Sequence, residues 1–175
     1  MNFSVRFPAA GLLAFLGCAT NPAARDDAAN RKMLALLLPS GIEIIEPFTR
    51  VANFDDDAEP DGIEVMLQAV NPLDSPCLMM VGTVRVELYE FVPASADNKG
   101  RRLEFWNVEL RDAEDQARHW NRVTQMYEFR LAVNPVNVPP LAERYVLAVT
   151  YNSPLGDHVS DEYVLQPGPS LRGAP

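Results

Sequence analysis

The sequence predicts an all-β fold, an antiparallel sandwich of two sheets with about seven strands. Several segments after Ile42 alternate apolar and polar residues with a period of two, which is typical of strands with one buried face. Loops that contain Pro, Gly, Asn and Asp separate these segments. One helix before the strands and one short helical insertion complete the expected architecture.

The first 17 residues have the three parts of a secretory signal. A short basic start with Arg6 precedes an apolar run over residues 7–16, and the small residue Gly17 follows it. The run counts ten residues, whereas a helix that spans a bilayer needs roughly 20. We therefore expect residues 1–17 to be a cleaved signal peptide and not a membrane span.

Gly17 and Cys18 make this stretch resemble a bacterial lipoprotein signal, in which the cysteine is acylated and becomes the first residue after cleavage. Phe15 departs from the pattern, because the family usually has Leu three residues before the cysteine. The resemblance implies that Cys18 is the lipidation site, and Ala19 after it implies sorting to the outer membrane of the cell envelope. Two alternatives remain open: cleavage at an ordinary small-x-small site, which would release a periplasmic or secreted protein, and a cytosolic protein with a chance apolar start.

Charge and cysteine content restrict the class of partner and the compartment. The net charge is −9, and loss of residues 1–17 would remove one arginine and no acidic residue, which gives −10. This acidic balance argues against a nucleic-acid partner, which requires a basic surface. Acylation of Cys18 would leave Cys77 without an intrachain disulfide partner. Cys77 lies in an apolar stretch, and we expect it to be a small buried hydrophobe.

The chain divides into a signal peptide at 1–17, a lipid-anchored tether at 18–40, a sandwich domain at 41–167 and a disordered tail at 168–175. Residues 26–38 contain tolerable helix formers, and Pro39 and Gly41 stop the pattern. The run from Met33 to Leu38 is apolar on every side, so one turn is expected to pack against the domain. A helix that lies on the membrane surface is the alternative.

Four segments show the clearest strand pattern, at residues 63–69, 84–88, 127–133 and 145–151. Weaker patterns cover residues 42–54, 103–110 and 159–166. Pro47 interrupts the first of these and predicts an edge strand or a bend, because proline has no N–H for a sheet ladder.

Residues 140–147, Pro-Leu-Ala-Glu-Arg-Tyr-Val-Leu, resemble the tyrosine corner of immunoglobulin-like and fibronectin-type domains. Tyr145 occupies the tyrosine position at the start of the sixth strand, so the resemblance implies that its hydroxyl bonds to the preceding loop. Leu147 stands where immunoglobulins have the second core cysteine, which fits a cysteine-free variant. Trp106 is a candidate for the core tryptophan.

Residues 111–122 predict a short helix that crosses between the sheets. Glu114 and Arg118 are spaced for an ion pair one turn apart, and acidic residues come early. Trp120, with Arg118 and Arg122 on either side, is a candidate ligand-stacking surface. The alternative is that Trp120 anchors the helix on the rim of the sandwich.

Asp57, Glu59 and Asp61 match the alternating oxygen ligands that open a calcium loop, and Gly62 follows them. The match then fails, because Gln68 occupies the twelfth position where a bidentate Glu is expected. These acidic residues are therefore weak metal candidates, and a solvated acidic turn is the alternative.

Catalytic motifs are sparse. Asp157, His158 and Ser160 lie almost side by side, but triad residues must converge in space, and neighbours on a strand point to opposite faces. We expect a non-enzymatic, cofactor-free interaction or structural module that is tethered to the membrane and binds an envelope protein. Two alternatives are a glycan or small-ligand module and a calcium-stabilised secreted sandwich. The first would use the aromatic residues Trp106, Trp120, Tyr89 and Phe91.

Overall fold

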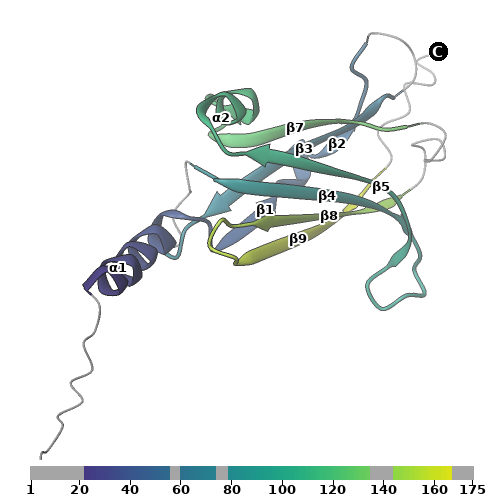
Figure 1. Ribbon diagram of the computed structural model, residues 1–175. Coiled ribbons are helices and arrows are strands. Elements are labelled where there is room, and N and C mark those ends of the chain that lie inside the picture. Colours follow the sequence, from purple (N-terminus) through teal and green to yellow (C-terminus); the bar gives the residue numbers. More distant parts are fainter. Residues whose placement is uncertain (1–21, 56–59, 74–78, 135–143, 167–175) are drawn as a thin grey trace, which may run out of the picture.

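The computed structural model describes residues 22–55, 60–73, 79–134 and 144–166. It contains two antiparallel sheets packed face to face, with one helix before the first strand and one in a connection from one sheet to the other (Figure 1). The prediction of an all-β sandwich is confirmed. The first sheet has the order β1-β3-β7-β6, with β2 also paired to β3: β1 Gly41–Ile44, β2 Arg50–Ala52, β3 Gly62–Val70, β6 Trp120–Asn121 and β7 Met126–Ala132. The second sheet has the order β5-β4-β8-β9: β4 Gly82–Phe91, β5 Lys99–Leu110, β8 Tyr145–Asn152 and β9 His158–Leu165.

The order of the strands can be compared with that of immunoglobulin-like sandwiches. The first sheet corresponds to strands A, B, E and D of that fold, and the second to C′, C, F and G. All seven expected segments form strands: residues 42–54 form two, β1 and β2, and β6 is a short addition. The chain changes sheet between β3 and β4, between β5 and β6, and between β7 and β8.

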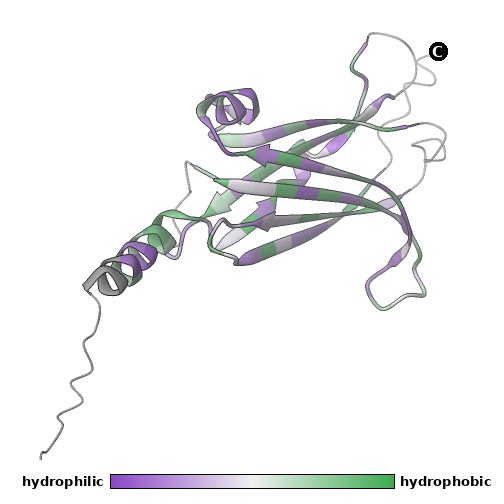
Figure 2. Cartoon of the chain, in the orientation of Figure 1, coloured by the Kyte–Doolittle hydropathy of each residue, from purple (hydrophilic) through white to green (hydrophobic). Residues whose placement is uncertain are grey.

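The core lies between the sheets and is built by the alternation along each strand. Figure 2 shows apolar and polar residues following one another along the arrows, as a half-buried strand requires. Ile63, Val65 and Leu67 point inward from β3, and Val84, Val86 and Leu88 do so from β4. The largest fully buried side chains include those of Tyr127, Phe129, Tyr145, Leu147, Tyr151 and Leu165.

Pro47 marks a break in the first edge strand, as its sequence position predicts. After β1 the chain makes a single 3-10 turn, η1 Glu46–Phe48, and then pairs with β3 again as β2. Thr49 closes the break, because its buried hydroxyl accepts a hydrogen bond from the Met66 amide at 3.2 Å. Strands β1 and β2 thus remain paired with the same neighbour, β3.

One hydrogen bond joins the two sheets at each side of the sandwich. On one side, the Ile44 amide in β1 donates to the Asp161 carboxylate in β9 at 2.7 Å. On the other, the Trp106 indole in β5 donates to the Ala132 carbonyl in β7 at 2.9 Å. Trp106 is partly buried and packs against the core from this edge strand, whereas the core tryptophan of immunoglobulins lies on strand C.

Helix α2 Ala113–His119 makes the predicted crossing between the sheets. The carboxylate of Asp112 caps its start by accepting from the Glu114 and Asp115 amides, at 2.9 Å each. The helix is shorter than residues 111–122, because Trp120 already pairs with Tyr127 as part of β6.

Helix α1 Pro22–Leu37 confirms the predicted first helix, which Pro39 stops. The expectation that the apolar turn packs against the domain is met only by Ala35 and Leu38, which line a hollow against it. Met33, Leu34, Leu36 and Leu37 are 47–66% exposed. The helix projects from the end of the sandwich where the β8–β9 turn lies, so only one side of it meets the domain (Figure 1).

Tyr145 begins β8 and is buried, and Leu147 lies in the core as expected. The preceding loop, residues 135–143, lies outside the described residues. The hydroxyl bond of the tyrosine corner therefore stays a prediction. The expected tail at 168–175 also lies outside the described part of the chain.

A buried polar network holds the segment that enters β4. The Met80 amide donates to the Tyr127 hydroxyl at 2.8 Å, and that hydroxyl donates to the Gln116 side chain at 2.5 Å. The Gln116 amide group in turn donates to the Met80 carbonyl at 2.9 Å and to the Leu110 carbonyl at 3.2 Å. The network joins β7, α2, β5 and the start of β4.

Replacement of Tyr127 by Phe tests this network. Tyr127→Phe would leave the buried Met80 amide without its acceptor, so we expect the free energy of unfolding to fall by about 1–3 kcal/mol. Urea denaturation measures it. Tyr163→Phe, at a half-buried tyrosine of β9, is the control and should have a smaller effect. Equal losses of unfolding free energy for the two variants would contradict the role assigned to the Tyr127 hydroxyl.

Candidate interaction face

Trp120 is placed at the rim of the sandwich. Its ring stands edge-on against the ring of Tyr127, with centroids 5.1 Å apart, and packs against the core. Arg118 forms ion pairs with Glu114 and Asp115 on its own helix, at 3.1 and 3.5 Å. Arg122 is exposed in the turn after β6. The position of Trp120 fits an anchoring role, and ligand stacking by these three residues stays a prediction.

The calcium hypothesis is only partly covered by the structure. Asp57 and Glu59 lie outside the described residues. The Asp61 carboxylate accepts a hydrogen bond from the Phe54 amide at 2.5 Å, which closes the turn between β2 and β3. Within the described ranges, no group of three or more His, Cys, Asp or Glu side chains could hold a metal ion.

Cys18 and Cys77 also lie outside the described residues, so lipidation of Cys18 and burial of Cys77 stay predictions. Among the helices that the structure describes, none is long and apolar enough to cross a membrane.

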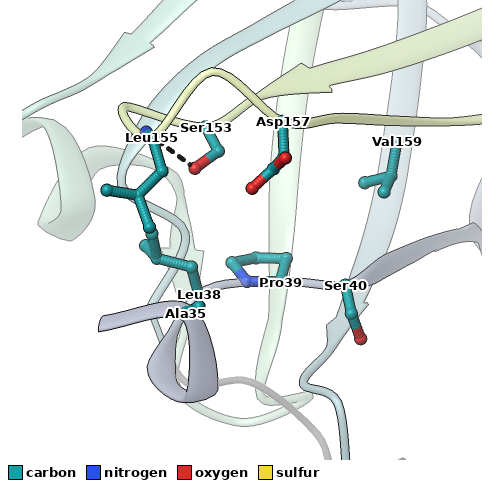
Figure 3. Close-up of a pocket in the computed structure, with 8 residues that line it drawn as sticks. All are labelled: Ala35, Leu38, Pro39, Ser40, Ser153, Leu155, Asp157 and Val159. Carbon is teal, nitrogen blue, oxygen red and sulfur yellow. Dashed lines mark hydrogen bonds between the residues drawn. The ribbon is translucent and has the colours of Figure 1, made fainter. Parts of the chain in front are cut away.

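A shallow hollow of about 250 Å³ lies between the end of α1 and the turn from β8 to β9. Figure 3 shows Leu38 and Pro39 facing Leu155 and Asp157 across it. Its walls are mostly apolar, and Asp157 is the one ionisable group among its lining residues. A single carboxylate does not supply the pair of groups that general acid–base catalysis uses. The hollow is better described as the place where the end of α1 meets the domain.

The outer face of the second sheet carries a compact group of charged and aromatic side chains. Arg85 and Glu87 project outward from β4, because Val84, Val86 and Leu88 take the inward positions. Phe105 in β5 lies opposite Glu87, and Arg102 lies opposite Tyr89. We call Arg85, Glu87, Arg102 and Phe105 the Phe105 cluster.

Both arginines of the Phe105 cluster contact the carboxylate and the ring. Arg85 and Arg102 hydrogen bond to the same Glu87 oxygen, at 3.0 and 2.8 Å. Their guanidinium carbons lie 4.9 and 5.1 Å from the centre of the Phe105 ring. The ring nevertheless remains 44% exposed. The cluster therefore presents an apolar ring beside two cations, and its net charge is +1 on a strongly acidic protein.

Further cation–aromatic contacts continue along β4. The Lys99 ammonium lies 5.2 Å from the centre of the Tyr89 ring and forms an ion pair with Glu162 in β9. The Arg144 guanidinium carbon lies 4.3 Å from the centre of the Phe91 ring. All three rings thus have cations over them, and Phe105 is the most exposed of the three.

The electrostatics of the cluster are governed by the shared carboxylate. Partial burial would raise the pKa of Glu87, but the hydrogen bonds from Arg85 and Arg102 outweigh it and hold this pKa below its ordinary value. Burial raises the pKa of the Tyr89 hydroxyl, and the nearby Glu87 carboxylate adds to the rise. Glu87 is thus ionised at neutral pH and keeps the two guanidinium groups together.

The sequence contains only part of the signal for this cluster. The alternation in β4 predicts that Arg85 and Glu87 face outward. Leu103 and Phe105 are two residues apart and so are expected on one face, yet Leu103 is buried and Phe105 is exposed. A bulge causes this difference: Leu88 pairs with Glu104, whereas Tyr89 pairs with Arg102.

Comparison of the chain with models of protein families, with curated proteins and with solved structures found no match.

Glu87→Gln tests the electrostatic role of the cluster. We expect a lower melting temperature at neutral pH, because both arginines lose their shared carboxylate. Since the folded-state pKa of Glu87 is below the ordinary value of 4.5, its contribution is present above that value and is lost as pH falls through the folded pKa. The gap in melting temperature between natural chain and variant should therefore narrow below pH 4.5.

Glu114→Gln is the matched control, because Glu114 forms an exposed ion pair one turn from Arg118. Thermal denaturation followed by circular dichroism at several pH values measures both variants. A gap for Glu87→Gln that is unchanged between neutral pH and about pH 3 would contradict the proposed linkage.

Proposed function

We propose that this protein is a non-enzymatic lipoprotein of the bacterial cell envelope, anchored through Cys18, whose sandwich binds a protein partner. The observation that carries the proposal is the sequence Phe15-Leu16-Gly17-Cys18 at the end of a short apolar run. The charge of −10 expected for the mature chain supports a protein ligand over nucleic acid. The absence of Asp after Cys18 supports the outer membrane as its location, by the resemblance to lipoproteins.

The position of α1 supports an anchor at Cys18. Only residues 19–21 separate this cysteine from the helix, which leads directly into the first strand. Several acyl chains on one cysteine attach a protein firmly, because each buried methylene group contributes about 0.8 kcal/mol. The anchor would thus be joined to the domain by a mostly helical segment.

The Phe105 cluster is the proposed contact surface for the partner. Aromatic and arginine side chains are enriched at protein interfaces and among the residues that carry most binding energy. Phe105 projects from β5, which is the last strand of its sheet on that side. A partner can therefore contact the ring and pair with the sheet edge at the same time.

A protein partner explains this face better than a glycan does. Sugar binding uses open aromatic faces, whereas Tyr89, Phe91 and Phe105 all have cations over their rings. Trp120 packs against Tyr127, and Trp106 is held by its bond to Ala132. The exposed Phe105 with two arginines beside it has the composition of a protein contact.

Mass spectrometry of the mature N-terminus tests the anchor. The natural chain should yield an acylated peptide that begins at Cys18, and Cys18→Ser should abolish acylation and release the protein from the membrane fraction. Recovery of an unacylated natural chain, cleaved nearby and soluble in the envelope, would refute the lipoprotein assignment.

Affinity capture from solubilised envelopes tests the contact surface. We expect the natural chain to enrich a protein that Phe105→Ser loses by about tenfold or more, because a central aromatic contact contributes at least 1.4 kcal/mol in many interfaces. Val123→Ser, an exposed apolar position in the turn after β6, is the matched control and should retain the protein. Capture that is equal for both variants would exclude the Phe105 cluster.

A further inference from the structure

Exposed apolar side chains are concentrated at one end of the sandwich. Nine large apolar side chains are exposed in the described part of the chain. Phe48 and Phe105 lie elsewhere, whereas the other seven lie on α1 or in the loops at its end of the sandwich: Met33, Leu34, Leu36, Leu37, Leu73, Met79 and Val123. This end also holds the turn from β8 to β9, which lines the hollow beside α1.

The four exposed apolar residues of α1 share one side of the helix. At about 100° per residue, Leu36, Met33, Leu37 and Leu34 fall within an arc of about 160°. Ala35 lies opposite this arc and, with Leu38, lines the hollow against the domain. We call Met33, Leu34, Leu36 and Leu37 the apolar arc. They belong to the end of α1, which is green in Figure 2. The domain therefore leaves the apolar arc uncovered.

Charge around the apolar arc suits a lipid surface. By the same geometry, Lys32 lies just beyond Leu36 and Arg31 just beyond Leu34, so a basic residue borders each side. Lysine and arginine at such borders extend their charges toward lipid headgroups while apolar neighbours contact the acyl chains. Two acidic residues lie about two turns or more closer to the start of the helix: Asp27 near the same border, and Asp26 in line with the middle of the arc.

The position of Cys18 favours the membrane as the surface that covers the apolar arc. Four residue steps join Cys18 to Pro22, a reach of at most about 14 Å. An acyl chain on Cys18 would therefore hold the start of α1 close to the bilayer surface. We infer that the apolar arc of α1 lies on the lipid bilayer beside the anchor, as a second attachment point; this inference rests on the proposed lipoprotein function.

Vesicle flotation without the acyl chain tests the inference. The chain from residue 18 to residue 175, which keeps every described residue, carries Cys18→Ser and is mixed with vesicles of phosphatidylethanolamine and a minority of phosphatidylglycerol. We expect it to float with the vesicles. Met33→Gln with Leu37→Gln should lower the partition coefficient by about tenfold or more, because two apolar contacts with lipid are lost.

The matched control is Phe48→Gln with Phe105→Gln, which also replaces two exposed apolar residues and should stay within about twofold of the parent chain. Melting temperatures verify that both double variants are folded. Failure of the parent chain to float, or equal flotation of the parent and the arc variant, would overturn the inference.

Light scattering of the same samples without vesicles tests whether a second copy of the chain, and not the membrane, covers the apolar arc. A dimer that the arc substitutions convert to a monomer would assign the arc to a second copy of the chain and would also overturn the inference. Mass spectrometry of Cys18 in the natural chain keeps the two proposals apart. An acylated cysteine with no flotation refutes the arc alone, and arc-dependent flotation with an unmodified cysteine refutes the anchor alone.

Discussion

The hydrogen bonds around Met80 are the constraint on which the arrangement of the two sheets depends. A chain that leaves β3 and enters β4 must bury part of its backbone at the end of the core, where an unpaired amide or carbonyl costs free energy. Tyr127 and Gln116 satisfy the Met80 groups, and the Tyr151 hydroxyl donates to the Val81 carbonyl. One side chain of the first sheet, one of α2 and one of the second sheet thus fix this crossing.

Hydrogen bonds from side chains to backbone groups also hold the two sides of the sandwich together. Asp161 points toward the core from an edge strand, which would be unfavourable for an isolated carboxylate, but it accepts the Ile44 amide. Trp106 has the same function on the other side through its bond to Ala132. The first bond joins the edge strands β1 and β9, and the second joins the edge strand β5 to β7. These edges therefore depend on tertiary contacts and not only on sheet ladders.

Sequence periodicity was sufficient for the strands and insufficient for the surfaces. The alternation around Tyr127 and Tyr145 identifies core strands, because each strand buries one face whatever its neighbours are. Strand β6 has two residues and depends on the contact of Trp120 with Tyr127, so no local pattern predicts it. The Phe105 cluster depends on the bulge at Leu103, and the exposure of Met33 depends on which side of α1 meets the domain. Both are tertiary properties.

The break in the first edge strand has a mechanical consequence. Tension applied through α1 acts first on β1, which has four residues paired with β3. Those pairs and the bond from Ile44 to Asp161 can open from the end, one after another, up to the 3-10 turn at Pro47. After this turn, the buried Thr49 hydroxyl accepts a hydrogen bond from the Met66 amide in β3. The strand break therefore divides the pairing with β3 into two short ladders, so loss of the β1 ladder would leave the β2 ladder and the Thr49 bond in place.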